Sequence, residues 1–169
     1  EIFGVRLYHE DMNAIEYKYE FENGKRDPVE FVQMDDKDNY TVWCVENDQH
    51  ILLNDNLNEY HKYVKTIKVP SGEMPNSLIF CPMHGDGKVI GVLTVQSFKK
   101  HAYTNYHLNL VNTLASYTGA ALNNAALYDT LEQKVEERTL ELEEKNKDIM
   151  SSINYAKRIQ NGILPSASF

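Results

Sequence analysis

The stretch that decides the architecture of this chain is Leu131-Glu132-Gln133-Lys134-Val135-Glu136-Glu137-Arg138, which continues to Lys147 almost wholly in strong helix formers. Between Ala120 and Asn161 the sequence has neither Gly nor Pro. The pattern predicts one helix from about Asn105 to Leu164. At about 1.5 Å per residue, roughly 58 residues reach on the order of 85 Å, which exceeds the width of a domain of this size. We therefore expect the helix to leave the globular part.

Apolar residues recur at every seventh position of this helix, and two more lie four residues before the next of them. We call these nine residues the heptad seam: Ala121, Tyr128, Leu131, Val135, Leu142, Ile149, Ala156, Ile159 and Ile163. Such spacing is typical of a coiled coil. A single exposed helix with a half-apolar stripe is unstable in water, so the seam needs a partner. We expect a homodimer formed through this helix.

The seam is imperfect in its middle. Arg138, Lys145 and Ser152 occupy companion positions where apolar residues are expected, and Ile153 next to Ile149 indicates a shift of phase. This predicts a pairing that is adjustable rather than locked.

Length, charge and cysteine content limit the classes of protein to which this chain can belong. Of 169 residues, about 105–125 remain for one globular domain. The formal net charge of -8 argues against a nucleic-acid partner, and no apolar run reaches the ~20 residues of a membrane span. Two cysteines, Cys44 and Cys81, do not form a disulfide framework, which favours the cytoplasm. The chain starts without Met and is expected to be a fragment.

The globular part alternates strand and loop signals. Residues 2–8 and 14–22 read as an antiparallel hairpin in which Ile15, Tyr17, Tyr19 and Phe21 share one face. Residues 25–39 read as a polar connection, 40–45 as a short helix or turn, 49–53 as a short strand and 57–64 as a helix. Residues 77–83 and 88–97 read as the central strands, joined by a turn whose glycines supply positive φ. The predicted fold class is α+β, an antiparallel sheet flanked by helices with a long C-terminal helix.

Several segments together resemble the end of a GAF domain: Pro82-Met83, 87–97, Tyr103-Thr104, Leu114-Ala115 and 120–125. The resemblance covers Ile2 to Tyr128, without the helix that usually precedes the first strand. It implies a GAF-like, small-molecule-binding or dimerising regulatory module. We expect a sensor domain at residues 1–127, a coiled-coil signalling helix at 128–161 and the start of an effector junction at 162–169.

The C-terminal piece from Ile149 to Pro165 resembles the segment before the catalytic domain of a bacterial PPM-type protein serine/threonine phosphatase of the sporulation stage II kind. This resemblance implies that the chain regulates such a phosphatase. The metal-binding aspartates of that family are absent from residues 1–169. The alternative effector is a histidine kinase. No His follows His107, so the coiled-coil part at 128–161 cannot itself be phosphorylated on histidine.

No catalytic or metal-ligating constellation is apparent, and no cofactor is expected. Asp35, Asp36 and Asp38 lack the Gly and Glu of a calcium loop, and the two cysteines are expected to be buried. The GAF resemblance places a candidate pocket for an unknown small molecule on the sheet face covered by residues 39–72. The candidate residues are Trp43, Asn54, Asp55, Tyr60, Tyr63, Phe80 and Ser97. Aromatic walls with a few polar groups suit a planar ligand. A core without any ligand is the alternative.

Overall fold

The computed structural model describes residues 1–67 and 73–163. It divides into two compact units, Glu1–Asn124 and Ala125–Phe169. The elements are β1 (Ile2–His9), β2 (Ala14–Glu22), β3 (Lys25–Arg26), β4 (Glu30–Gln33), α1 (Tyr40–Asn47), β5 (Ile51–Leu53), α2 (Asn56–Glu59), the 3₁₀ helix η1 (Tyr60–Lys62), β6 (Ser77–Gly85), β7 (Lys88–Ser97) and α3 (Asn105–Ile163). Residues 164–169 of the expected effector junction lie outside the described residues.

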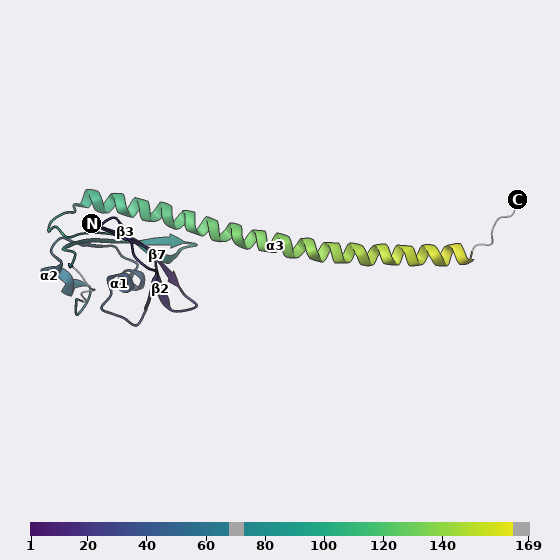
Figure 1. Cartoon of the computed structure of the whole chain (residues 1–169), viewed down its shortest axis with the longest axis horizontal. Helices are drawn as coiled ribbons and strands as arrows, with labels where there is room; N and C mark the ends of the chain where they lie inside the picture. Colours follow the sequence, from purple (N-terminus) through teal and green to yellow (C-terminus); the bar gives the residue numbers. More distant parts are fainter. Residues whose placement is uncertain (68–72, 164–169) are drawn as a thin grey trace. The chain divides into compact units, whose positions relative to one another are not determined.

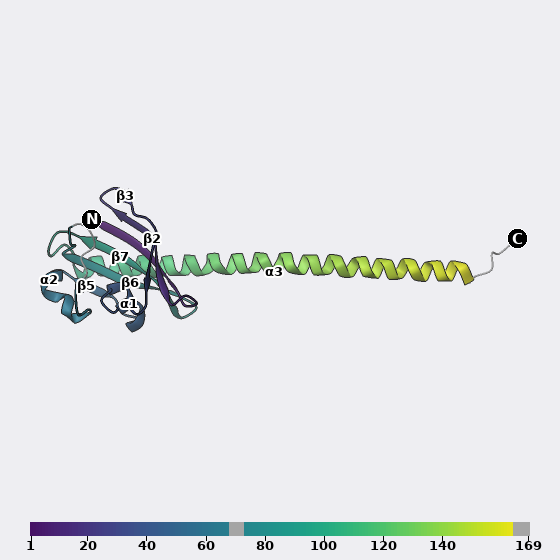
Figure 2. The same cartoon turned by 60° about the horizontal axis from the view of Figure 1, so that its bottom comes forward.

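One antiparallel sheet organises the first unit. Its strand order is β3-β2-β1-β7-β6-β5, and β4 also pairs with β2. Figures 1 and 2 show α1 on one side of this sheet and the beginning of α3 on the other. The α+β arrangement is confirmed, and β6 and β7 both lie inside the sheet. The two middle strands are β1 and β7, however, and β6 lies one place nearer the edge, beside β5.

The predicted single face of β2 is wrong because the strand contains a bulge. Tyr17 pairs with Arg6 but Tyr19 pairs with Val5, which leaves Lys18 as an extra residue. An extra residue reverses the side-chain alternation beyond it. Ile15 and Tyr17 therefore share the α1 side of the sheet, whereas Tyr19 and Phe21 pair with Val5 and Phe3 on the α3 side.

Two strands were missed in the segment expected to be a polar connection. β3 follows the turn at Asn23-Gly24 and pairs with the end of β2, and β4 pairs with its beginning. The turn between β6 and β7 also differs in part from its prediction. Asp86 and Gly87 have positive φ of 51° and 76°, but Gly85 does not. Gly85 lies beneath Asn123, whose Oδ1 would be 2.9 Å from a Cβ built on this glycine.

Helix α3 packs on the sheet through its first turns. Leu108, Val111 and Ala115 are buried against a cluster on β6 and β7 that includes Met83 and Leu93. Further along, the helix backbone itself touches β6, because a Cβ built on Gly119 would lie 2.6 Å from the carbonyl oxygen of His84. These contacts fix α3 to the sheet as far as Leu122.

Helix α3 begins directly after Thr104. The Thr104 carbonyl accepts the first helical hydrogen bond, from the Leu108 N–H, at 3.1 Å. The Thr104 N–H in turn donates to Nδ1 of His107 at 3.1 Å, so that a histidine takes the place that Glu or Gln has in a capping box.

The second unit consists, over its described residues, of the remainder of α3. Its apolar side chains are exposed in the isolated chain, including those of Tyr128, Leu131, Val135, Leu142, Ile149 and Ile159. The Ile163 side chain lies outside the described residues. Within the described ranges no helix combines the length and apolar character needed to cross a membrane.

Candidate functional site

A buried arginine occupies the space between the sheet and α1. Arg6 donates from Nη1 to Oγ1 of Thr41 at 2.6 Å and from Nη2 to Oε1 of Glu20 at 2.6 Å. Its guanidinium also lies 4.0 Å from the ring centroid of Tyr17. The Arg6 and Glu20 side chains are only 7% and 13% exposed. The face of the sheet on which we expected a pocket is thus partly filled by the protein's own charged pair.

The position of Glu20 depends on a glycine in the neighbouring strand. A Cβ built on Gly4 would lie 2.7 Å from Oε2 of Glu20. Only the absence of a side chain there leaves room for the carboxylate to lie over β1 and reach Arg6. Sequence reasoning missed this pair because the bulge at Lys18 moves Glu20 from the predicted wet face to the α1 face.

The four predicted aromatic residues take part in three ring contacts, and one of these residues, Phe80, lies beside Arg6. The rings of Trp43 and Tyr63 meet edge to face with centroids 4.7 Å apart. Phe80 lies 5.7 Å from Tyr40 and 5.3 Å from the Arg6 guanidinium. Tyr60 lies in η1 and its ring meets that of His61. Trp43, Tyr63 and Phe80 belong to one hydrophobic cluster.

The predicted polar residues serve the connection that leads into α3. Asn54 donates from Nδ2 to the Tyr103 carbonyl at 2.8 Å and accepts from the Tyr103 N–H at 3.1 Å. The side chain thereby pairs with both backbone groups of one residue, and we call this pair the Asn54–Tyr103 clamp. The Ser97 hydroxyl accepts from the Lys99 N–H at 3.3 Å. Asn54 and Ser97 thus fix the loop between β7 and α3.

Asp55 and Glu59 extend this arrangement at α2. Asp55 pairs with Lys100 at 2.8 Å, and hydrogen bonds from Lys100 and Asn58 lower its pKa. Glu59 accepts the N–H groups of Asn54 and Asp55 at 3.0 and 3.1 Å. The hydrogen bond from Lys62 and that from the Asn54 backbone lower the pKa of Glu59 to about 2. The carboxylate of Glu59 therefore favours the native turn only while it is ionised.

This lowered pKa predicts a pH dependence. Because the pKa of Glu59 falls from an ordinary 4.5 to about 2 on folding, its contribution is complete above about pH 4.5 and is lost as the pH falls towards 2. The side chain is 31% exposed, so we expect about 1 kcal/mol after solvent screening. Urea unfolding at about pH 6 and about pH 3 measures it. Glu59→Gln should lose less stability between these two pH values than the parent chain. An equal loss would contradict the assignment.

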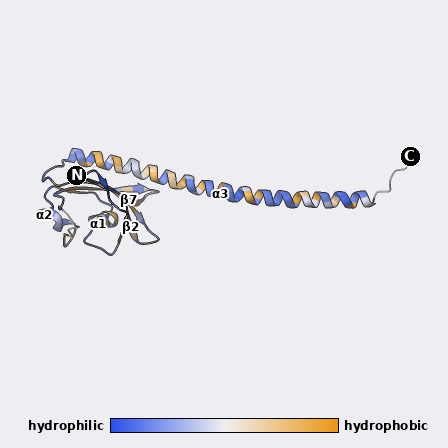
Figure 3. Cartoon of the chain, in the orientation of Figure 1, coloured by the Kyte–Doolittle hydropathy of each residue, from blue (hydrophilic) through white to orange (hydrophobic). Residues whose placement is uncertain are grey.

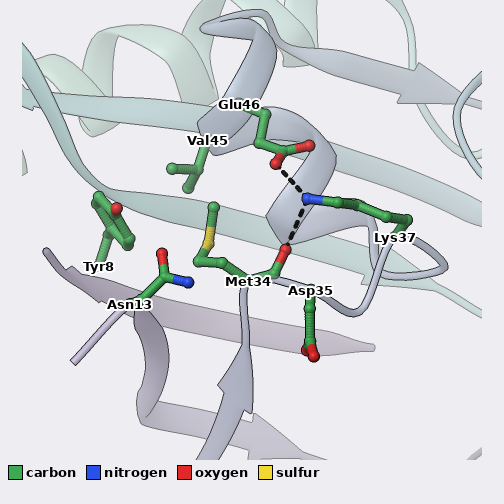
Figure 4. Close-up of a pocket in the computed structure, with 7 residues that line it drawn as sticks. All are labelled: Tyr8, Asn13, Met34, Asp35, Lys37, Val45 and Glu46. Atoms are coloured by element: carbon green, nitrogen blue, oxygen red, sulfur yellow. Dashed lines mark hydrogen bonds and ion pairs between the residues drawn. The ribbon is translucent and has the colours of Figure 1, made fainter.

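Two cavities lie beside Tyr8 and the end of α1, and none of the seven predicted residues lines either. The larger, of about 440 Å³, is lined by Tyr8, Asn13, Met34, Asp35, Lys37, Val45 and Glu46. Figure 4 shows Lys37 between the Met34 carbonyl, which it reaches at 2.8 Å, and Glu46. The second, of about 350 Å³, adds Glu10, Lys88, Val89 and Ile90 to Tyr8 and Val45. Most polar side chains of the larger cavity are exposed, so this cavity is a shallow surface depression.

The two thiols are placed for packing rather than for reaction. Cys44 and Cys81 are fully buried and belong to different hydrophobic clusters. Burial raises the pKa of Cys81 to about 12 and that of Cys44 still further. Among the described residues, no three His, Cys, Asp or Glu side chains gather as metal ligands would. Asp38, one of the three aspartates compared above with a calcium loop, accepts hydrogen bonds from the N–H groups of Lys65 and Thr66, each at 3.0 Å.

An apolar stripe remains on α3 within the first unit. Leu110, Leu114 and Tyr117 are 49%, 47% and 72% exposed. The sheet-facing residues of α3 begin at Leu108 and Val111, so the helical repeat of 3.6 residues puts this stripe on a different side of the helix. Figure 3 shows that apolar residues are frequent in this first part of α3 and sparser towards its C-terminal end.

The sequence of the first unit matches a known domain family. The family model of the GAF domain matches residues 4–123, and the chain belongs to the GAF domain family. No curated protein matches the chain in sequence.

Solved structures share the fold at low sequence identity. A methyl-accepting chemotaxis protein, residues 122 to 287, aligns with a TM-score of 0.61 and 13% identity over 76% of this chain and 80% of its own. The type II free methionine-R-sulfoxide reductase of Thermoplasma acidophilum has a TM-score of 0.57 and 16% identity over 71% and 76%. The GAF domain of the Acinetobacter phosphoenolpyruvate-protein phosphotransferase has a TM-score of 0.56 and 14% identity over 75% and 73%.

Proposed function

We propose that this chain is the cytoplasmic regulatory module of a signal-transduction protein. The module dimerises through α3 and relays a change in the packing of the paired helices to an effector domain. The observation that carries the proposal is the continuity of α3. The helix is packed on the GAF sheet through Leu108, Val111 and Ala115, and the same helix carries the heptad seam, whose described large apolar side chains are exposed. The chemotaxis protein among the similar structures supports a signalling role.

The reductases with this fold suggest an enzyme as a rival class. The chemistry that their name implies would call on an accessible redox group. Both cysteines of this chain are buried, with raised pKa values, and a protonated buried thiol is a poor nucleophile. The thiols therefore support a regulatory module over a thiol-based reductase. Incubation of the chain with free methionine sulfoxide and dithiothreitol tests this, and formation of methionine would contradict it.

The effector in this proposal is a protein serine/threonine phosphatase of the PPM type. This assignment rests on the sequence between Ile149 and Pro165. A histidine kinase is the alternative effector. The gene downstream of residue 169 decides between them, because a catalytic domain of about 200 residues is recognisable from its own sequence. Release of phosphate from a phosphoserine peptide by the full-length protein, dependent on a divalent metal, supports the phosphatase. ATP-dependent labelling of a histidine contradicts it.

We propose that a small-molecule ligand, if the module senses one, binds at the aromatic residues of the α1 face, which are Trp43, Tyr60, Tyr63 and Phe80. A module without a ligand is the second candidate, and the observation that favours it is the contact of Trp43 with Tyr63. Native mass spectrometry of the purified chain separates the two. A discrete added mass on each protomer, lost in Trp43→Ala, supports a ligand, and an unmodified mass supports the ligand-free module.

The polar companion positions predict that the two helices of the dimer pair weakly in this part of the seam. Replacing Arg138, Lys145 and Ser152 together with Leu should raise the stability of the dimer by about 1 kcal/mol or more for each position, because apolar companion positions bury surface on pairing. Sedimentation equilibrium measures the dissociation constant. In the full-length protein the same change should fix effector activity at one level. An effector whose activity and response are unaltered would contradict the relay.

A further inference from the structure

We propose that the dimer is anchored on the GAF unit itself, where the exposed stripe Leu110, Leu114 and Tyr117 of α3 packs against the same stripe of a second copy of this chain. The inference rests on the proposed dimerisation through α3 and locates its strongest part. It places the anchor ahead of the first seam residue, Ala121, rather than in the second unit.

The first argument is the phase of the repeat. Leu114 precedes Ala121 by seven residues, and Tyr117 and Leu110 precede Ala121 and Leu114 by four. These are the spacings that relate Leu131 to Val135 and the other seam residues to one another. A parallel pair of helices that meets at the seam therefore also brings these three residues to its axis.

The second argument is that this side of α3 is not used by the sheet. Leu108, Val111 and Ala115 are buried in the core, whereas Leu110 and Leu114 remain about half exposed and Tyr117 is 72% exposed. Large apolar side chains that line one side of a helix at this exposure mark an interaction surface.

The third argument is the absence of charge. From Asn105 to Tyr128, α3 contains no Asp, Glu, Lys or Arg, and charged residues begin at Asp129. An ordinary exposed helix face carries charges, and the centres of protein interfaces are depleted of them. In a pair related by a two-fold axis each residue near the axis faces its own copy, so a charge there would face a like charge. The uncharged stripe therefore suits a second copy of this chain.

The fourth argument compares the two parts of the helix. Two of the three companion positions in the first unit, Leu110 and Tyr117, are apolar, and the third, Asn124 at the end of the unit, is polar but uncharged. Those of the second unit include Arg138, Lys145 and Ser152, which weaken pairing there. The anchor is therefore on the GAF unit, and the adjustable part follows it. A relay needs such an order, because the helices must stay paired while their distal packing changes.

Cysteine cross-linking of the full chain tests the anchor. The two native cysteines are fully buried, so a single introduced thiol reports its own surroundings. Tyr117→Cys should form a disulfide-linked dimer under mild oxidation, and Ser116→Cys, the exposed neighbour off the stripe, should not. Leu131→Cys reports the seam of the second unit. Linkage at 117 and 131 but not at 116 supports the anchor. Linkage at 131 alone overturns it and leaves the proposed dimer standing, whereas linkage at neither position overturns both. Equal linkage at 116 and 117 also overturns the anchor.

A charge-insertion experiment measures the anchor independently. The pair Leu110→Glu and Leu114→Glu should weaken dimerisation by about 100-fold or more, since four carboxylates would meet near the axis. Leu140→Glu is the matched control, because Leu140 is 62% exposed and lies outside the repeat. Its dissociation constant should stay within about threefold of the parent value. Trp43 fluorescence verifies that each variant is folded. An unchanged dissociation constant in the folded double variant overturns the proposal.

Discussion

Glu20→Ala is expected to lower the free energy of unfolding of the GAF unit by about 3 kcal/mol, because it leaves the buried Arg6 guanidinium without its counter-charge. The pair is bidentate, with Nη2 and Nε of Arg6 at 2.6 and 3.2 Å from the two carboxylate oxygens. Urea unfolding followed by the fluorescence of Trp43, the single tryptophan of the chain, reports this unit directly. All variants must be compared at one protein concentration if the chain dimerises.

Two further variants identify the cause. Arg6→Met combined with Glu20→Ala should recover about 1 kcal/mol or more relative to Glu20→Ala alone, since no unpaired charge then remains in the core. Glu10→Ala breaks an exposed pair with Lys88, whose side chains are more than 70% exposed, and should change stability by less than about 1 kcal/mol. If Glu20→Ala were as mild as Glu10→Ala, the buried pair would not be a main support of the α1 face.

Gly119→Val is expected to lower the free energy of unfolding of the GAF unit by about 3 kcal/mol, because the valine side chain clashes with the backbone of β6. A Cβ at this position lies 2.6 Å from the His84 carbonyl oxygen and 2.8 Å from its nitrogen. Neither atom belongs to a side chain that can rotate away. The turn of α3 around residue 119 must therefore lift from the sheet, and amide hydrogen exchange between Val111 and Leu122 should become faster.

Another glycine of the same helix provides the control. A Cβ built on Gly162 meets no atom within 4 Å, and Gly162→Ala should leave the unfolding of the GAF unit unchanged while it slightly favours helix. Wild-type exchange rates in Gly119→Val would show that α3 does not depend on this close approach.

The sequence predicted the fold well because its strongest signals are periodic. The seven-residue spacing and the absence of Gly and Pro located α3 as far as its described end, and the apolar run around Val92 located the centre of the sheet. β3 has two residues and β4 has four, and strands this short carry too few side chains for alternation to reveal them.

The candidate site was harder to predict because it depends on register. The bulge at Lys18 decides that Glu20 meets Arg6, and no composition signal marks it. The sequence singled out Asn54 as a candidate pocket residue, and in the structure its side chain binds the backbone of Tyr103. Its hydrogen-bond partner Tyr103 lies 49 residues away, and only the assembled sheet brings the two together. A useful signal in retrospect is Gly4, since a glycine inside a strand indicates a close approach.

The Asn54–Tyr103 clamp also bears on the order in which the chain acquires its structure. Helical turns of α3 grow from contacts four residues apart and appear within about a microsecond. The clamp joins residues 49 positions apart, and it closes only when β5, β6 and β7 have found their register. Turns of α3 therefore form transiently before the helix is attached to the sheet, and the sheet stabilises them afterwards. A chain that stalls before the sheet assembles would display the uncharged stripe and the sheet-facing side of this helix together, which is the form most prone to pair with the wrong neighbour.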